Sequence, residues 1–76
     1  MKVRYKGQSF YQGAGLTDGA MYEVVAVEPP FLRIIDDEGE DYLYSIFGPG
    51  PLDDEPGGIW EIVEDDEKGT LAKLMK

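Results

Sequence analysis

Apolar and polar residues alternate with a period of two over most of this chain, a pattern that predicts β-strands rather than helices. In residues 2–6, Val3 and Tyr5 alternate with three cations, so one side of the predicted strand is apolar and the other is charged. Four more segments are rich in β-branched and aromatic residues and are predicted to be strands: 21–28, 31–36, 40–45 and 59–64.

Glycine, proline and acidic residues mark the connections between these strands. Residues 7–19 are predicted to form a long irregular loop that ends in a Thr-Asp-Gly turn, and its apolar residues indicate that it folds back on the core. Residues 37–39 predict a tight hairpin turn, in which Gly39 can adopt a positive φ. Residues 47–58 contain three prolines and four glycines, so we expect a surface loop there.

Five short strands without a long helix predict an all-β fold, namely a small five-stranded barrel. We assign residues 1–64 to this barrel domain, and residues 65–76 to an acidic turn and a C-terminal tail. The tail has the apolar spacing of one or two helical turns, which are either docked on the barrel or frayed. The expected core residues are Val3, Tyr22, Val24, Ile34, Leu43 and Ile62.

Four motifs together suggest a known plan: Leu16-Thr17-Asp18-Gly19, Tyr22-Glu23-Val24, the stretch from Ile35 to Tyr42, and the stretch from Gly57 to Val63. Their order resembles that of SH3-like barrels, with residues 7–19 in the place of the RT loop. More closely, residues 2–64 are similar to small uncharacterised SH3-like proteins of Gram-positive bacteria and their phages or mobile elements. The resemblance implies a fold and no activity. The chain lacks the Ala-Leu-Tyr-Asp-Tyr signature and the Trp-Trp pair of SH3 domains that bind proline-rich peptides.

Size and composition restrict the classes of function. Seventy-six residues allow one domain with a small core. The chain has no cysteine and no histidine, so disulfides and the common zinc ligands are missing, and the expected location is the cytoplasm. No apolar run approaches the roughly 20 residues that a membrane-spanning helix needs.

The net charge of −9 is unevenly distributed along the chain. Residues 1–17 carry three cations and no acid, a net +3, whereas residues 18–76 carry all sixteen acids and four cations, a net −12. Such a surface repels phosphates and anionic lipids, so we expect no direct binding of nucleic acid or membranes. The charge permits attraction to a basic protein, or it simply keeps a small protein in solution.

Acidic residues crowd the predicted hairpin and form a candidate acidic surface: Asp36, Asp37, Glu38, Glu40 and Asp41. Carboxylates suit Ca²⁺, but no segment has the spacing of an EF-hand loop, so neither a metal site nor a cofactor is predicted. Without histidine, cysteine or a phosphate-binding glycine motif, nucleophilic catalysis lacks its usual base. We therefore do not expect an enzyme.

Six aromatic residues are candidate binding residues: Phe10, Tyr11, Tyr42, Tyr44, Phe47 and Trp60. If Leu43 points inward, Tyr42 and Tyr44 form an exposed patch near the following loop. The opposite register would bury both tyrosines and remove that patch. The two aromatic residues of the long loop are either a lid over the core or contact residues.

The three cations of the first strand, Lys2, Arg4 and Lys6, form a basic stripe. They contact an acidic partner or, as we favour, pair across strands with acids such as Glu23 or Glu61. We expect a non-enzymatic protein-interaction module, monomeric by default, that contacts another protein through its aromatic and loop surface. The alternative is an acidic inhibitor or DNA mimic that binds a basic nucleic-acid-binding protein.

Overall fold

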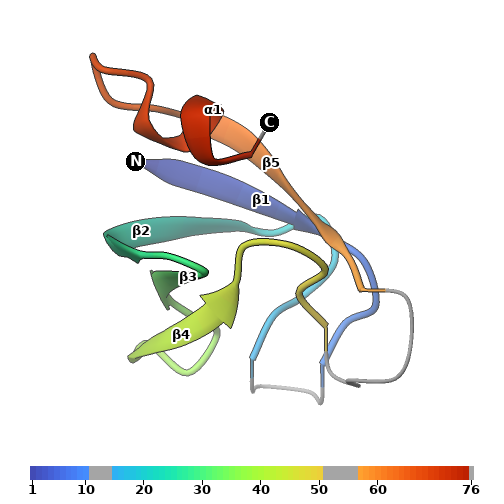
Figure 1. Ribbon diagram of the computed structural model, residues 1–76. Helices are drawn as coiled ribbons and strands as arrows, with labels where there is room; N and C mark the ends of the chain where they lie inside the picture. The colour runs from blue at the N-terminus through green and yellow to red at the C-terminus, as the bar shows by residue number, and fades with distance from the viewer. Residues whose placement is uncertain (11–14, 51–56, 76) are drawn as a thin grey trace.

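The computed structural model describes residues 1–10, 15–50 and 57–75. Five strands form an antiparallel sheet in the order β4-β3-β2-β1-β5, and a short helix follows the last strand (Figure 1). The elements are β1 (Lys2–Lys6), β2 (Met21–Glu28), β3 (Phe31–Ile35), β4 (Asp41–Ser45), β5 (Ile59–Glu64) and α1 (Thr70–Leu74). The predicted all-β fold with five strands is confirmed, and only the hairpin ends of β3 and β4 are shorter than expected.

The sheet does not close into a barrel, so that part of the fold prediction is wrong. Among the described residues, the strand pairing ends at β4 on one side and at β5 on the other. Strand β2 belongs to both halves of the sheet, because Tyr22 pairs with Val3 of β1 while Val24 pairs with Ile34 of β3. A side chain connects the two ends: the indole N–H of Trp60 donates to the backbone oxygen of Ser45 at 2.9 Å.

The core lies on the inner side of the sheet. Four of the predicted core residues, Val3, Tyr22, Val24 and Ile34, are buried, and Ile62 is half-buried against them. Leu43 is 43% exposed, so its assignment to the core is wrong. The remaining buried apolar residues are Tyr5, Leu16, Leu32, Ile46, Trp60 and Leu71.

The described part of the long loop between β1 and β2 packs on this core, as predicted. Leu16 is 1% exposed, and its backbone oxygen accepts a hydrogen bond from the amide of Phe10 at 2.8 Å. The predicted turn is also present, because the amide of Ala20 donates to the oxygen of Thr17 at 3.1 Å and Gly19 has a φ of 83°.

The C-terminal tail is docked rather than frayed. Leu71 of α1 is fully buried, and two aspartates that precede the helix accept hydrogen bonds from its first amides. Asp66 bonds the amide of Thr70 at 2.9 Å, and Asp65 bonds the amides of Leu71 and Ala72 at 3.0 Å each. Hydrogen bonds lower the pKa of both aspartates because they stabilise the charged carboxylate: mainly the bond from the Leu71 amide for Asp65, and mainly the bond from the Thr70 hydroxyl for Asp66. Two of the four acids at positions 64–67 therefore stabilise the start of α1.

Candidate functional site

The acidic hairpin between β3 and β4 is built on a glycine turn. The amide of Gly39 donates to the backbone oxygen of Asp36 at 2.9 Å, and the amide of Glu38 donates to the Asp36 carboxylate at 2.9 Å. Gly39 has a φ of 79°, a conformation that side chains disfavour. The predicted tight turn is thus confirmed.

Two of the five candidate acids hold this hairpin in place. Asp36 is only 6% exposed and accepts a hydrogen bond from the Tyr44 hydroxyl at 2.6 Å. Asp37 accepts bonds from the hydroxyls of Tyr22 and Thr17, both at 2.7 Å, which ties the hairpin to the long loop. Burial and the adjacent carboxylate raise the pKa of Tyr44. Asp36 is therefore a buried structural residue, while Asp37, Glu38, Glu40 and Asp41 are exposed.

The register between β3 and β4 settles which way the tyrosines of β4 face. Tyr42 and Tyr44 pair with Ile34 and Leu32, two fully buried residues, so the tyrosines lie on the inner side of the sheet. Leu43 pairs with Arg33 and lies on the outer side. The register in which Leu43 points inward and both tyrosines lie on the outer side is therefore not observed.

A bulge in β2 creates an apolar area on the outer side of the sheet. The pairing of β2 with β3 shifts between Val24 and Ala26, which leaves Val25 as the additional residue. Val25 is 46% exposed, next to Ile35 at 38% and Leu43 at 43%. We call this outer side of β2, β3 and β4 the acidic face, because acids surround these apolar side chains.

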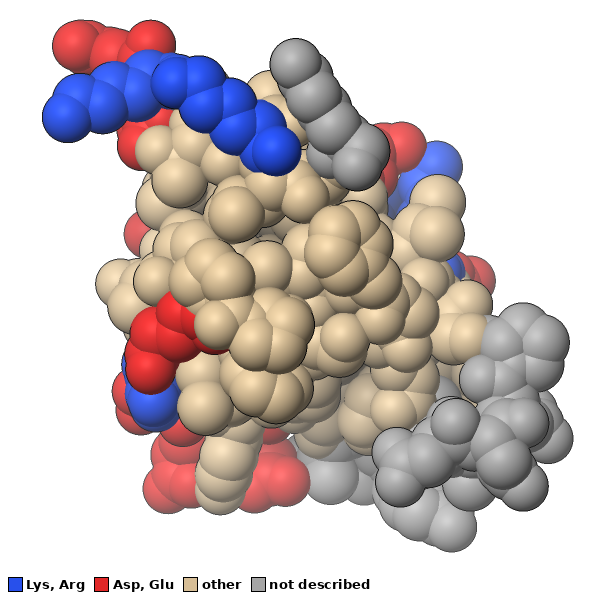
Figure 2. Space-filling model, viewed as in Figure 1, with Lys and Arg blue, Asp and Glu red and all other residues tan. Residues whose placement is uncertain are grey.

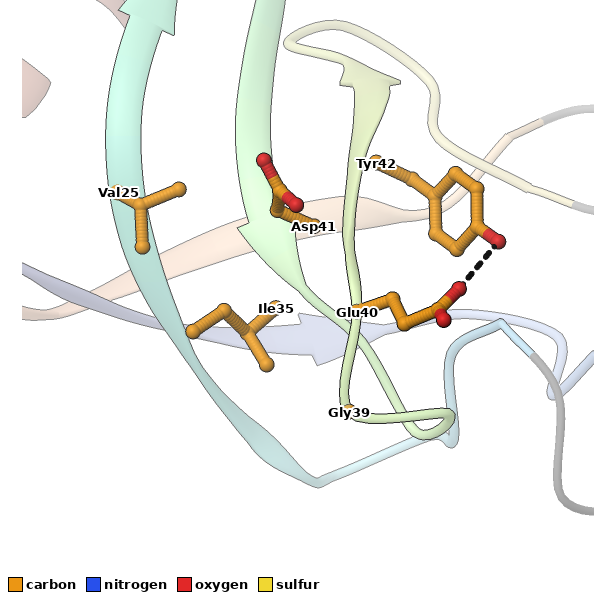
Figure 3. Close-up of a pocket in the computed structure, with 6 residues that line it drawn as sticks. All are labelled: Val25, Ile35, Gly39, Glu40, Asp41 and Tyr42. Carbon is orange, nitrogen blue, oxygen red and sulfur yellow. Dashed lines mark hydrogen bonds between the residues drawn. The ribbon is translucent and has the colours of Figure 1, made fainter.

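A shallow groove of about 490 Å³ lies at the hairpin end of the acidic face and extends across β4 to Tyr42 on the inner side. Its lining residues are Val25, Ile35, Gly39, Glu40, Asp41 and Tyr42 (Figure 3). In Figure 3, Val25 and Ile35 lie on one side of β4, and the Tyr42 hydroxyl donates to Glu40 at 2.8 Å on the other. The groove thus combines an apolar floor with a carboxylate rim.

Three charged side chains form an ion cluster across the acidic face. Arg33 donates to Glu28 at 2.7 Å and to Asp41 at 3.3 Å. The hydrogen bond to Glu28 is the main reason why the pKa of Arg33 is raised. Because one cation serves two acids, the cluster keeps a net negative charge.

Acidic side chains gather over the turn between β3 and β4, at the bottom of the view in Figure 2, while the middle of that view carries few charges. The candidate acidic surface therefore lies over this turn, and two of its acids, Glu40 and Asp41, line the groove. Three further acids of the chain, Asp53, Asp54 and Glu55, lie outside the described residues.

The candidate aromatic residues do not form one surface. Trp60 is 8% exposed and belongs to the core, and the half-buried Phe10 ring packs edge-on against Tyr44 at 6.0 Å and Tyr5 at 6.1 Å. Tyr42 is 44% exposed and Phe47 is 63% exposed. Tyr11 lies outside the described residues.

Phe47 and Trp60 do meet at a second, smaller hollow of about 170 Å³. It is apolar and is lined by Ile46, Phe47, Gly48, Gly58, Ile59, Trp60 and Met75. This hollow joins the end of β4, the start of β5 and the C-terminal tail. It brings together two of the predicted binding residues and has no charged lining residue.

Two cations of the basic stripe of β1, Arg4 and Lys6, pair across strands, as we favoured. Glu61 of β5 contacts Arg4 at 2.9 Å and Lys6 at 2.8 Å, and this contact lowers the pKa of Glu61. We call the outer side of β5, β1 and β2 the basic face, since its ion cluster contains two cations and one acid.

Val25 and Ile35 were not predicted from the sequence to lie on the surface. A signal was present, because Val24-Val25 and Ile34-Ile35 are adjacent apolar pairs. Neighbouring residues of a strand point to opposite sides, so one member of each pair must face outward. Two such pairs on adjacent strands indicate an outer apolar area.

Within residues 1–10, 15–50 and 57–75, no three acids come together in a geometry that could hold a metal ion. No helix in this part of the chain is long and apolar enough to span a membrane. Comparisons of the chain with protein-family models, with curated proteins and with solved structures gave no match.

Proposed function

We propose that this protein is a non-enzymatic interaction domain that binds a basic, partly apolar segment of another protein on its acidic face. The observation that carries this proposal is the groove that the apolar side chains of Val25 and Ile35 line together with the acidic residues Glu40 and Asp41. Covering exposed apolar side chains favours binding, and the carboxylates attract a positively charged partner.

This surface differs from the aromatic surface that we expected from the sequence. Trp60 and Tyr44 already pack within the protein, and their hydroxyl or indole groups have internal partners. Of the described candidates, only Tyr42 and Phe47 are exposed by more than a third. The hollow beside Phe47 can hold one apolar side chain, and we assign it a secondary contact.

We also propose that the fold is an open variant of the SH3-like arrangement. Support comes from the antiparallel strand order, the long loop between β1 and β2 and the shared strand β2. The Trp60–Ser45 hydrogen bond holds β4 and β5 near each other where strand pairing is missing. Fold alone implies no ligand, so the functional proposal depends on the groove.

The alternative hypothesis, an acidic inhibitor or DNA mimic, has weaker support. Several acids that would have to imitate phosphates have internal partners instead. Asp36 and Asp37 bond hydroxyl groups within the protein, and Asp65 and Asp66 bond the start of α1. These four carboxylates are less available to cations of a partner.

The test uses peptides selected from a displayed random library on the wild-type protein. Their affinity is then measured for the double variant Glu40→Gln/Asp41→Asn and for the control Glu64→Gln/Glu67→Gln. Both variants lose the same charge, so they separate a local contact from a general attraction.

We expect selected peptides to be enriched in Lys, Arg and aliphatic residues. The groove variant should weaken their binding about tenfold or more, because close charge pairs at interfaces couple by about 1.5 kcal/mol or more. The control should change binding much less. Peptides without basic residues, or equal losses in both variants, would contradict the proposal.

A further inference from the structure

The hydrogen-bond pattern of β4 defines an open strand edge. The amide of Asp36 donates to the oxygen of Glu40 at 3.1 Å, and the amide of Ile46 donates to the oxygen of Pro30 at 2.9 Å. These two bonds flank the pairing of β3 with β4. Because hydrogen-bonded pairs alternate in an antiparallel ladder, Tyr42 and Tyr44 bond β3 through their backbone. The backbone groups of Asp41, Leu43 and Ser45 then point away from β3.

An independent contact supports this orientation. The oxygen of Ser45 accepts the indole N–H of Trp60, which comes from the side opposite to β3. That end of the edge is therefore occupied. In the described residues no strand pairs with the rest of the edge, where the backbone N–H and C=O groups of Asp41 and Leu43 lie. Unpaired edge groups of this kind are ready to pair with an added strand.

We propose that the basic partner segment binds by strand addition, as an extended strand that pairs with the open edge of β4 at Asp41 and Leu43. This inference rests on the proposed function, and it adds how the segment is held. Backbone pairing supplies the contact, and the alternate side chains of the segment supply selectivity. The outward-facing side chains of the segment then lie beside Leu43 and Asp41, next to the groove.

The negative charge beside the open edge of β4 favours a partner segment that contains Lys or Arg. Asp41 lies on the edge strand itself, and Glu38 and Glu40 lie in the turn before it. Opposite charges on neighbouring strands stabilise a sheet, whereas like charges destabilise it. A second copy of this chain carries a net charge of −9 and would bring the same acids to the edge. A basic partner segment therefore fits better than self-pairing.

The test measures amide hydrogen exchange by NMR in the wild-type protein, alone and with a Lys/Arg-containing peptide selected from the displayed random library. In the free protein, the amides of Tyr42 and Tyr44 should exchange slowly, and those of Asp41 and Leu43 should exchange fast. The peptide should slow exchange at Asp41 and Leu43 by about tenfold or more, as expected for newly paired edge amides. The variant Leu43→Pro, which removes one edge donor, should bind the peptide more weakly than Leu43→Ala, which keeps it.

The possible failures are distinguishable. A peptide that binds and shifts the resonances of Val25 and Ile35 without protecting Asp41 and Leu43 would overturn strand addition and leave the proposed function intact. Failure to select any basic peptide would overturn both. Protection that rises with protein concentration alone would show self-pairing and contradict a basic occupant. If Leu43→Pro does not fold, the exchange measurement on the wild type still decides.

Discussion

The two outer faces of the sheet carry ion clusters of opposite composition. On the basic face, Glu61 bonds Arg4 and Lys6, so one acid serves two cations. On the acidic face, Arg33 bonds Glu28 and Asp41, so one cation serves two acids. Both clusters lie among exposed apolar side chains, such as Ile59 on the first face and Val25 on the second.

The difference between the faces lies in what surrounds each cluster. The strand of the basic face that ends the sheet, β5, leads into the docked helix α1. The strand that ends the acidic face, β4, has an open edge and a groove beside it. Similar surface chemistry therefore has different consequences, since the acidic face combines a net negative ion cluster, a groove with an apolar floor and the free backbone groups of β4. The following predictions test this contrast.

The largest loss of stability is expected for a substitution in α1, the helix that follows β5. Leu71 is fully buried, so Leu71→Ala should lower the free energy of unfolding by about 2–5 kcal/mol, because it leaves a cavity in the core. Urea denaturation measures this change. Leu74→Ala is the control and should cost clearly less, since Leu74 is half-buried. Equal small effects of the two variants would show that α1 does not contribute to the core.

The next largest loss of stability is expected when the hydrogen bond between Tyr44 and Asp36 of the acidic hairpin is removed. Tyr44→Phe removes the hydroxyl that bonds the buried Asp36, and should cost about 1.5–3 kcal/mol, the usual contribution of a hydrogen bond to a charged group. Tyr42→Phe removes a similar bond to Glu40, but in solvent, and should change the free energy of unfolding little. The comparison fails if Tyr42→Phe is as destabilising as Tyr44→Phe.

Acidification should loosen α1, the helix that follows β5. The pKa values of Asp65 and Asp66 are lowered from an ordinary value of 3.8, mainly by hydrogen bonds to Leu71 and Thr70 respectively. The folded state therefore favours the charged carboxylates, and their contribution is complete above that value and is lost as the pH falls through the lowered pKa. Amide resonances of Leu71 and Ala72 should report loosening of α1 in this range. The variant Asp65→Asn should show weaker pH dependence, and an unchanged profile would contradict the assignment.

The smallest effects on stability are expected at the ion clusters, because exposed ion pairs contribute little. Arg33→Gln and Glu61→Gln should both leave the unfolding midpoint nearly unchanged. They should differ in binding: Arg33→Gln makes the acidic face more negative and should strengthen binding of a Lys/Arg-containing peptide, whereas Glu61→Gln should not weaken it. Titration of the selected peptide against each variant measures this contrast, and a loss of binding in Arg33→Gln would contradict it.

Local patterns predicted most of the fold. The alternation in residues 2–6 correctly placed Val3 and Tyr5 inside and the cations outside, and turn residues located the hairpin at Gly39. Closure of the sheet was mispredicted, because it depends on pairing between β4 and β5, which are distant in sequence. Such long-range pairing leaves no local signal in the chain.

The candidate site was only partly predictable, because it too depends on how strands pair. The acidic hairpin is visible in the sequence, but the faces of β4 depend on its register, and a shift of one residue exchanges them. Leu43 was therefore placed inside although it lies outside. The register shift at Val25 also depends on the pairing with β3. Trp60 was proposed for binding, but its burial depends on contacts with Tyr5 and Ser45.

The central claim is that the acidic face, and not the basic face, binds a basic partner segment. Chemical-shift mapping with the selected Lys/Arg-containing peptide tests it most directly. We expect chemical-shift changes at Val25, Ile35, Asp41 and Leu43, with the resonances of Arg4, Lys6 and Met21 unchanged. Shifts confined to Arg4, Lys6 and Met21, or spread equally over both faces, would contradict it.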